Sequence, residues 1–145
     1  MYKLKFKDLI FLTNKRKIQK NVIFFFYGLG LSSDDFKEIL YNNKSLKQII
    51  IAELPGHNNY PFKKHNDNIF EFTKQIFLFI KKNNIKNIIY FSHSLGGLIP
   101  ILLHKFFLKK KIRIKKFINY EGNLTEHDTK MVTKKTSSYI ESEYY

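Results

Sequence analysis

The stretch Ile88–Gly97 has the sequence Ile-Ile-Tyr-Phe-Ser-His-Ser-Leu-Gly-Gly, and an apolar helical pattern from Leu98 to Leu108 follows at once. A short apolar run of this kind is typical of a buried strand. The Ser-x-Ser-x-Gly-Gly sequence at its end predicts a tight turn that presents Ser94, and the residues after it predict a helix. A buried strand that turns directly into a helix favours a sheet whose strands are connected by helices.

The spacing around Ser94 has a physical reason. A serine at the apex of such a turn, the nucleophile elbow, takes a strained backbone conformation that holds its Oγ clear of the sheet. Residues two before and two after it must be small, because strand and helix pass close together there. Gly96 and Gly97 meet this demand, and Ser92 stands where the usual pattern has glycine. The alternative for the motif alone is a polar strand-to-helix turn with a glycine near the helix start.

Strand-like and helix-like patterns alternate along the rest of the chain. This alternation predicts an α/β fold, with a mostly parallel, doubly wound sheet and right-handed crossovers. The expected strands cover Tyr2–Lys7, Leu9–Thr13, Val22–Tyr27, Gln48–Glu53, Ile88–Phe91 and Lys116–Tyr120. The expected helices run from Ser32 or Ser33 through Tyr41, from Asp67 or Asn68 to Asn83, and from Leu95 to about Leu108.

Length and composition bound the class of protein. The chain has 145 residues, 43% of them hydrophobic and 17% aromatic, which suits one folded domain and excludes a disordered chain. No apolar run approaches the roughly 18 residues of a membrane span, and the basic start has no small-residue cleavage site. Cysteine is absent, which excludes disulfides and thiolate metal sites. We expect a cytoplasmic protein.

The chain is strongly basic, with 26 Lys and Arg against 12 Asp and Glu, and a net charge of +14. Such a charge attracts nucleic acid or an anionic membrane. However, lysine is scattered along the chain together with Asn, Ile, Phe and Tyr, and A/T-rich codons alone produce that composition. The densest cluster, Lys109–Lys116, lacks an aromatic platform on which bases would stack. Nucleic acid is therefore not the partner that we expect.

Two further segments carry a family resemblance together with the serine turn. Phe24–Gly30 has the sequence Phe-Phe-Phe-Tyr-Gly-Leu-Gly, Glu53–His57 has Glu-Leu-Pro-Gly-His, and Ser92–Gly97 follows them. Their order and spacing resemble the α/β-hydrolase fold family, where similar segments follow the third, fourth and fifth strands. Phe117–Leu124 resembles the sixth strand and its exit. The resemblance covers most of the chain and implies the N-terminal portion of such a fold, ending after about the sixth strand.

The resemblance implies a role for several residues of these segments. Ser94 is implied as a nucleophile that attacks an acyl carbonyl and forms an acyl-enzyme. The backbone N–H groups of Leu29 and Leu95 are implied as the oxyanion hole. Tyr27 replaces the family's common histidine, a position that supports the loop by a hydrogen bond. Gly28, Gly30 and Gly96 are implied as structural glycines. No metal or organic cofactor is expected.

The acid and the base of a catalytic triad are harder to assign. Glu121 stands at the end of the sixth expected strand, where some members of the family carry the acid; its alternative role is to position the following turn. A serine needs an adjacent base, and none of the five histidines occupies the position of the family's histidine. They are His57, His65, His93, His104 and His127.

The sequence therefore predicts a serine hydrolase for an ester, thioester or similar acyl bond, inactive as these 145 residues alone. Residues 1–123 are expected to form the N-terminal part of the hydrolase domain, and residues 124–145 the start of a lid or a disordered segment. Three explanations for the absent histidine stay open: a truncated hydrolase, a complementing second chain, or a non-catalytic interaction protein. The uncovered sheet edge is also expected to favour self-association.

Overall fold

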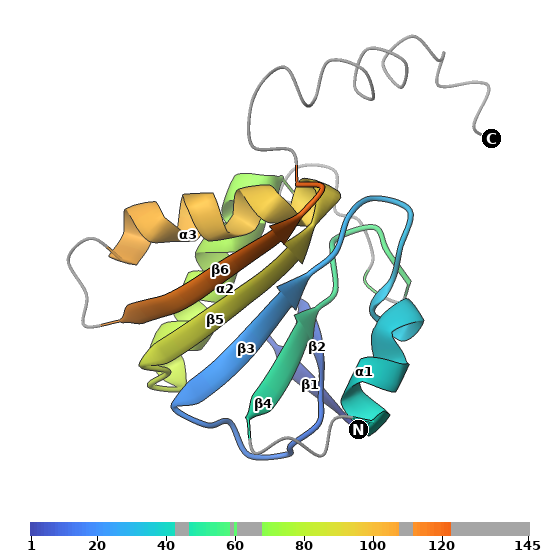
Figure 1. Ribbon diagram of the computed structural model, residues 1–145, viewed down its shortest axis with the longest axis horizontal. Helices are drawn as coiled ribbons and strands as arrows, with labels where there is room; N and C mark the ends of the chain where they lie inside the picture. Colours follow the sequence, from blue (N-terminus) through green and yellow to red (C-terminus); the bar gives the residue numbers. More distant parts are fainter. Residues whose placement is uncertain (43–46, 59, 61–67, 108–111, 123–145) are drawn as a thin grey trace, which may run out of the picture.

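A six-stranded sheet forms the centre of the part of the molecule that the computed structural model describes, residues 1–42, 47–58, 60, 68–107 and 112–122 (Figure 1). The strand order is β1-β2-β4-β3-β5-β6. The pairs β1/β2 and β2/β4 are antiparallel, whereas β4, β3, β5 and β6 run parallel. The strands are β1 (Tyr2–Phe6), β2 (Leu9–Thr13), β3 (Asn21–Phe26), β4 (Gln48–Ala52), β5 (Asn87–His93) and β6 (Arg113–Tyr120).

Helices cover both faces of this sheet, as a doubly wound arrangement requires (Figure 1). One face carries α2 (Ile69–Lys82) and α3 (Leu98–Phe107), and α3 follows the 3-10 turn η2 (Ser94–Gly97). The opposite face carries the 3-10 turn η1 (Ser33–Phe36) and α1 (Lys37–Asn42). Asn68 caps α2, because its side-chain oxygen accepts a hydrogen bond from the backbone N–H of Glu71 at 2.9 Å.

Aromatic side chains pack the two helical layers against the sheet. On one face, Phe79 of α2 stacks on Phe11 of β2 at 4.3 Å between ring centroids. On the other, Phe36 of η1 packs edge-on against Phe25 of β3 at 4.5 Å and stacks on Tyr27 at 5.8 Å. Phe79 also packs edge-on against Phe24 of β3, at 6.4 Å between ring centroids, so helical residues cover both faces of β3.

The predicted α/β fold class and the expected elements are confirmed, with shifted ends. The sixth strand begins at Arg113 rather than at the predicted Lys116, because a strand at the edge of a sheet tolerates charged side chains that a central strand would not. After β5, the chain forms η2 first, and α3 begins at Leu98. The predicted segment 124–145 lies outside the described residues.

Candidate active site

Ser94 occupies the turn between β5 and α3 in the conformation that the motif predicted. Its φ angle is +50°, in the left-handed region that residues other than glycine rarely adopt. The residue is half-buried, at the start of η2 and at the carboxyl end of β5, a central strand of the sheet. A strained serine at this place is the geometry of a nucleophile elbow.

Two glycines let neighbouring backbone pass close to the elbow. A Cβ atom added to Gly96 would lie 2.3 Å from the carbonyl oxygen of Phe26, the last residue of β3. A Cβ atom added to Gly28 would lie 2.6 Å from Cβ of Ser94 and 3.0 Å from its Oγ. Gly28 therefore lies directly against Ser94, and the loop after β3 and the elbow contact each other without a side chain between them.

Ser92 fits the position where glycine is usual. The residue is fully buried, and its hydroxyl donates a hydrogen bond of 3.4 Å to the side-chain oxygen of Asn119 on β6. Because the hydroxyl has a partner, its burial leaves no unpaired polar group beneath the elbow.

The two residues predicted for the oxyanion hole border one cavity. Leu29, whose side chain is 61% exposed, and Leu95 line a cavity of about 180 Å³ together with apolar and polar side chains. The other lining residues are Leu54, Pro55, His57, Asn68, Ile69 and Phe72. The wall of this cavity is mostly apolar, and it includes the residue that follows Ser94.

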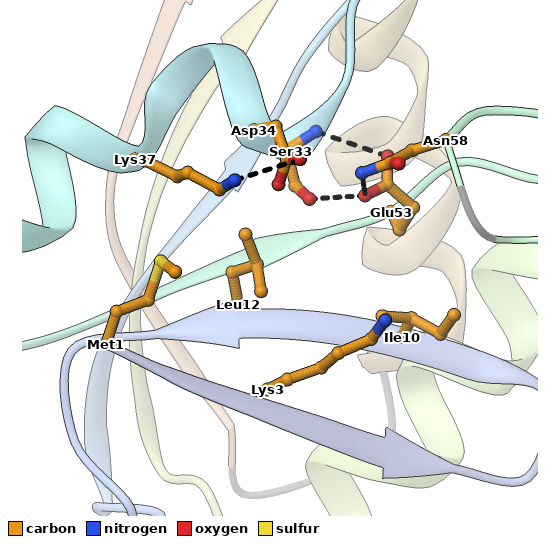
Figure 2. A pocket seen from close by; sticks show the side chains of 9 residues that line it. All are labelled: Met1, Lys3, Ile10, Leu12, Ser33, Asp34, Lys37, Glu53 and Asn58. Atoms are coloured by element: carbon orange, nitrogen blue, oxygen red, sulfur yellow. Dashed lines mark hydrogen bonds and ion pairs between the residues drawn. The ribbon is translucent and has the colours of Figure 1, made fainter.

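A single buried carboxylate holds both ends of the loop that carries Leu29. Glu53, immediately after β4, is 2% exposed. Its Oε1 accepts hydrogen bonds from the Tyr27 hydroxyl and, at 3.2 Å, from the backbone N–H of Ser33; its Oε2 accepts one from the Ser33 hydroxyl. Asn58 donates a longer bond of 3.5 Å to Oε2, and Figure 2 shows Ser33 and Asn58 on either side of this carboxylate. We call Glu53, Tyr27 and Ser33 the loop clamp.

Tyr27 takes its place in this clamp as a neutral phenol. Burial, and then the hydrogen bond to Glu53, raises the pKa of Tyr27 well above the ordinary value of a tyrosine. The hydroxyl donates to Glu53 and also accepts a hydrogen bond of 3.0 Å from the backbone N–H of Leu54. The prediction that Tyr27 supports the loop by a hydrogen bond is confirmed.

Glu121, the predicted acid, follows β6 directly and is exposed, with a φ angle of +47°. Among the described residues, it makes no hydrogen bond or ion pair. The same holds for Ser94, whose hydroxyl meets no histidine or carboxylate in hydrogen-bond geometry within that part of the chain. The sequence placed both residues correctly on their elements, and the described structure does not connect them.

The described histidines have other neighbours. His93 stacks on Tyr120 of β6 at 5.8 Å between ring centroids. The Nδ1 atom of His57 lies 3.0 Å from the carbonyl oxygen of Pro55, where it donates a hydrogen bond as N–H. His104 is exposed on α3. His65 and His127 lie outside the described residues.

Sequence reasoning missed the loop clamp. Ser33 was predicted as one of two helix caps, and the structure gives the cap to Ser32, whose backbone N–H donates to the Asp35 carboxylate at 2.6 Å. Glu53 was noted only as part of the Glu-Leu-Pro-Gly-His segment. The signal that points to Glu53 is an acidic residue directly after a fully apolar strand. Such a position places the carboxylate in the interior, where it needs several hydrogen-bond donors.

In the described ranges, no group of three or more His, Cys, Asp or Glu side chains is placed to hold a metal ion. None of the helices in the same ranges is long and apolar enough to cross a membrane.

Solved structures share the fold of this chain. A Rickettsia typhi chain whose assignment as a hydrolase is provisional is 28% identical, with a TM-score of 0.63, over 77% of this chain and 39% of that one. MenH from S. aureus is 18% identical, with a TM-score of 0.63, over 83% of this chain and 46% of that one. An α/β-hydrolase enzyme from the metagenome of lagoon sediments at Mar Chica, Morocco, is 18% identical, with a TM-score of 0.59, over 94% and 59%.

These comparisons establish that the chain has the α/β-hydrolase fold. It spans between 39% and 59% of the length of the three chains named. None of the protein-family models matches the sequence, and no curated protein matches it.

Proposed function

We propose that this chain is the N-terminal part of a serine hydrolase that acts on an ester, thioester or similar acyl bond of a small molecule in the cytoplasm. The observation that carries the proposal is the strained φ of +50° at Ser94, together with the close approach of Gly28 to its side chain. A strained serine against a glycine of the neighbouring loop is an arrangement that suits acyl transfer, because the oxyanion must reach backbone donors.

In the proposed reaction, Oγ of Ser94 attacks the acyl carbonyl carbon, and the alcohol or thiol leaves as the acyl-enzyme forms. The backbone N–H groups of Leu29 and Leu95 would donate to the oxyanion. The loop clamp supports this role, because it fixes the loop that carries Leu29 at Tyr27 and at Ser33. Water then cleaves the acyl-enzyme and releases the acid.

The proton on Ser94 needs an acceptor, and the described residues offer none in contact with it. We therefore propose that the base comes from outside the described part: from the remainder of the hydrolase, from a complementing chain, or from His127. Glu121, at the end of β6, is the candidate acid to orient that base. The alternative function is a pseudoenzyme that uses the fold for interaction only, and the unpartnered Ser94 hydroxyl within the described structure favours it.

Labelling of the purified 145-residue chain with a fluorophosphonate probe tests the proposal. The matched control is Ser92→Ala, because Ser92 lies two residues away but is fully buried. Labelling that disappears in Ser94→Ala and persists in Ser92→Ala would establish an activated Ser94. A folded wild-type chain that takes up no probe, alone or with added cell extract, would contradict an activated Ser94 in this chain and would leave a hydrolase fragment without its base, or the pseudoenzyme.

A further inference from the structure

Charge is distributed unevenly between the two ends of the parallel strands. In the part of the chain that the structure describes, every acidic residue lies toward the end where these strands finish. The positions are the strand exits, η1, the first turns of α1 and α2, and the β1–β2 turn, which lies at this end because β2 runs antiparallel to β4. The residues are Asp8, Asp34, Asp35, Glu38, Glu53, Glu71 and Glu121.

Three cations lie side by side at the opposite edge, where the parallel strands begin. The backbone N–H of Lys86 donates a hydrogen bond of 2.9 Å to the carbonyl oxygen of Lys20, and that of Arg113 donates one of 2.7 Å to the carbonyl oxygen of Lys86. The three residues therefore occupy neighbouring positions at the starts of β3, β5 and β6 (Figure 1). All three are exposed. We call Lys20, Lys86 and Arg113 the basic row.

The side chains of the basic row have no hydrogen bond or ion pair within the described ranges. Toward the other end of the strands, by contrast, Lys37 pairs with Asp34 at 2.9 Å and Lys74 with Glu71 at 3.3 Å. Like charges on neighbouring strands repel each other, and an external anion would relieve this repulsion. Codon bias explains many lysines, but it does not explain why the acidic residues are separated from these three.

Further cations extend the basic row along the same edge. Arg16 and Lys17 are exposed in the loop that leads to β3. The side chain of Gln48, the first residue of β4, donates a hydrogen bond of 2.9 Å to the carbonyl oxygen of Lys15 and so holds this loop at the edge. The last turn of α2 adds two more exposed lysines. The edge thus presents many positive charges spread over several segments.

Exposed amphipathic residues lie at the β1 and α1 end of this edge. Tyr2 is 44% exposed and pairs with Thr13, the residue from which the basic loop departs. Tyr41 is 59% exposed near the end of α1, from which the chain returns to begin β4. Tyrosine together with lysine is typical of surfaces that contact the headgroup layer of a membrane.

We propose that this edge docks on an anionic lipid bilayer, with the basic row against the headgroups. The attraction is diffuse, because lysines dominate the edge and α2 ends here, so that no helix N-terminus is present to bind a single phosphate. Such an attraction suits a broad anionic surface. Single-stranded nucleic acid also requires aromatic rings among the cations, and none of the residues flanking the basic row in sequence is aromatic.

The proposed docking leaves the opposite edge of the sheet facing water. Ser94 lies there, at the carboxyl end of β5. Where Ser94 acts as proposed above, its substrate would therefore arrive from the aqueous side; the docking itself does not depend on catalysis. Additional strands of a longer sheet would join beside β6, whereas the basic row and its neighbours precede β3, β5 and β6, so this edge would keep its cations.

Co-sedimentation of the 145-residue chain with lipid vesicles tests the proposal. The chain is expected to bind phosphatidylcholine vesicles that contain about 30% phosphatidylserine, and to bind pure phosphatidylcholine far more weakly. The binding should weaken as NaCl is raised, because salt screens the attraction. Replacing the basic row by Lys20→Gln, Lys86→Gln and Arg113→Gln should weaken binding about a hundredfold, since each cation near an anionic membrane contributes about fivefold.

The matched control removes three positive charges from other parts of the described chain by Lys5→Gln, Lys37→Gln and Lys74→Gln. It should stay within about threefold of the wild type, because charges beyond the screening length of about 8–10 Å contribute little. A variant with Lys20→Arg and Lys86→Arg should bind as the wild type does, which separates lost charge from lost folding. Equal losses in the two glutamine variants would overturn the proposal, as would a wild-type chain that ignores anionic vesicles or binds both kinds equally.

A single-stranded oligonucleotide of about 30 nucleotides tests the other polyanion. Tighter binding to it than to the anionic vesicles, lost in the variant of the basic row, would assign the edge to nucleic acid and overturn membrane docking.

A fluorescent label tests the orientation, because the chain has no cysteine of its own. Tyr41→Cys and Leu29→Cys are a matched pair, since Tyr41 is 59% exposed and Leu29 is 61% exposed at the opposite end of the strands. Quenching by acrylamide should fall several-fold at position 41 when anionic vesicles are added, and it should not change at position 29. Protection at position 29 instead, or equal protection at both positions, would show that another face docks.

Discussion

Gly28 shows how closely a single residue is tied to the elbow. Its hydrogen atom occupies the place where a methyl group would lie 2.6 Å from Cβ of Ser94. Its own φ is not in the left-handed region, so an alanine there is excluded by space and not by backbone conformation. Gly30 is the converse case, with a φ of +77° and nothing within 4 Å of an added Cβ atom.

Gly28→Ala is therefore expected to lower the free energy of unfolding by about 1–3 kcal/mol, the usual cost of overpacking. Urea denaturation followed by circular dichroism measures it. Gly30→Ala, which strains the backbone in open space, is the control and should cost about 1 kcal/mol. Equal losses of free energy of unfolding in the two variants would show that Ser94 can move to make room for a methyl group at residue 28.

Tyr90 offers a second prediction at the scale of one residue. Its ring is fully buried, its hydroxyl has no hydrogen-bond partner among the described residues, and burial raises its pKa. The pKa of Tyr27 is raised as well. Tyrosine titrates at about pH 10 in an unfolded chain, so the unfolded state loses these protons before the folded state does.

Stability is accordingly expected to hold below about pH 10 and to fall above it, by about 1.4 kcal/mol per pH unit for each of the two tyrosines. Tyr90→Phe should roughly halve this alkaline slope, and near neutral pH it should leave stability equal or higher, because an orphan hydroxyl is removed. Urea midpoints across the alkaline range measure both effects. Tyr41→Phe, at a position 59% exposed, should behave as the wild type.

At the scale of elements, the loop clamp joins the end of β3 to the start of η1 through the residue after β4. Its contacts connect residues 26 and 20 positions apart in the sequence. Tyr27→Phe removes the hydroxyl that Glu53 and the Leu54 amide share. The loss should be about 1–3 kcal/mol, because buried polar groups are left unpaired.

Glu53→Gln, combined with Tyr27→Phe in a double-mutant cycle, tests whether the two residues act together. A coupling of about 0.5–3 kcal/mol is expected, since they share one hydrogen bond. Additive losses would mean that the contact carries no energy of its own.

The elements also show what the sequence could predict. The apolar runs of β3, β4 and β5 identified the central strands within two residues, because strands buried on both faces leave an unbroken apolar signal. The Asn68 cap of α2 was also predicted, because a helix cap depends only on residues that are close in the sequence. The beginning of β6 was placed at Lys116 rather than Arg113, because the charges of this edge strand hide the pattern.

The site divides in the same way. The strained backbone of Ser94 was predicted, because the strand, the Ser-x-Ser-x-Gly-Gly turn and the helix that signal it are neighbours in the sequence. The loop clamp depends on contacts between distant segments, and no local pattern of Ser33 or Glu53 reports which donor meets which acceptor. The roles of Ser94, Leu29, Leu95 and Glu121 in catalysis stay predictions until labelling tests them.

At the scale of the whole molecule, the dominant property is charge. A net charge of +14 over 145 residues produces mutual repulsion that is larger in the compact state than in the unfolded chain. The thermal midpoint of a dilute sample is therefore expected to rise by several degrees when NaCl increases from about 10 mM to about 100 mM, as the screening length shortens. Differential scanning calorimetry measures this midpoint. A midpoint that does not change with NaCl would show that repulsion between the charges does not destabilise the folded chain.

The loop clamp has a consequence for how this chain can change by mutation. Tyr27, Ser33 and Glu53 come from three different segments, and the buried carboxylate of Glu53 accepts hydrogen bonds from both of the others. A substitution at one position therefore alters which residues are acceptable at the others. Libraries that randomise these positions one at a time will return mostly failures, whereas joint randomisation can find replacement trios. The three positions are therefore expected to change together, and a redesign of the loop beside Ser94 has to replace all three residues at once.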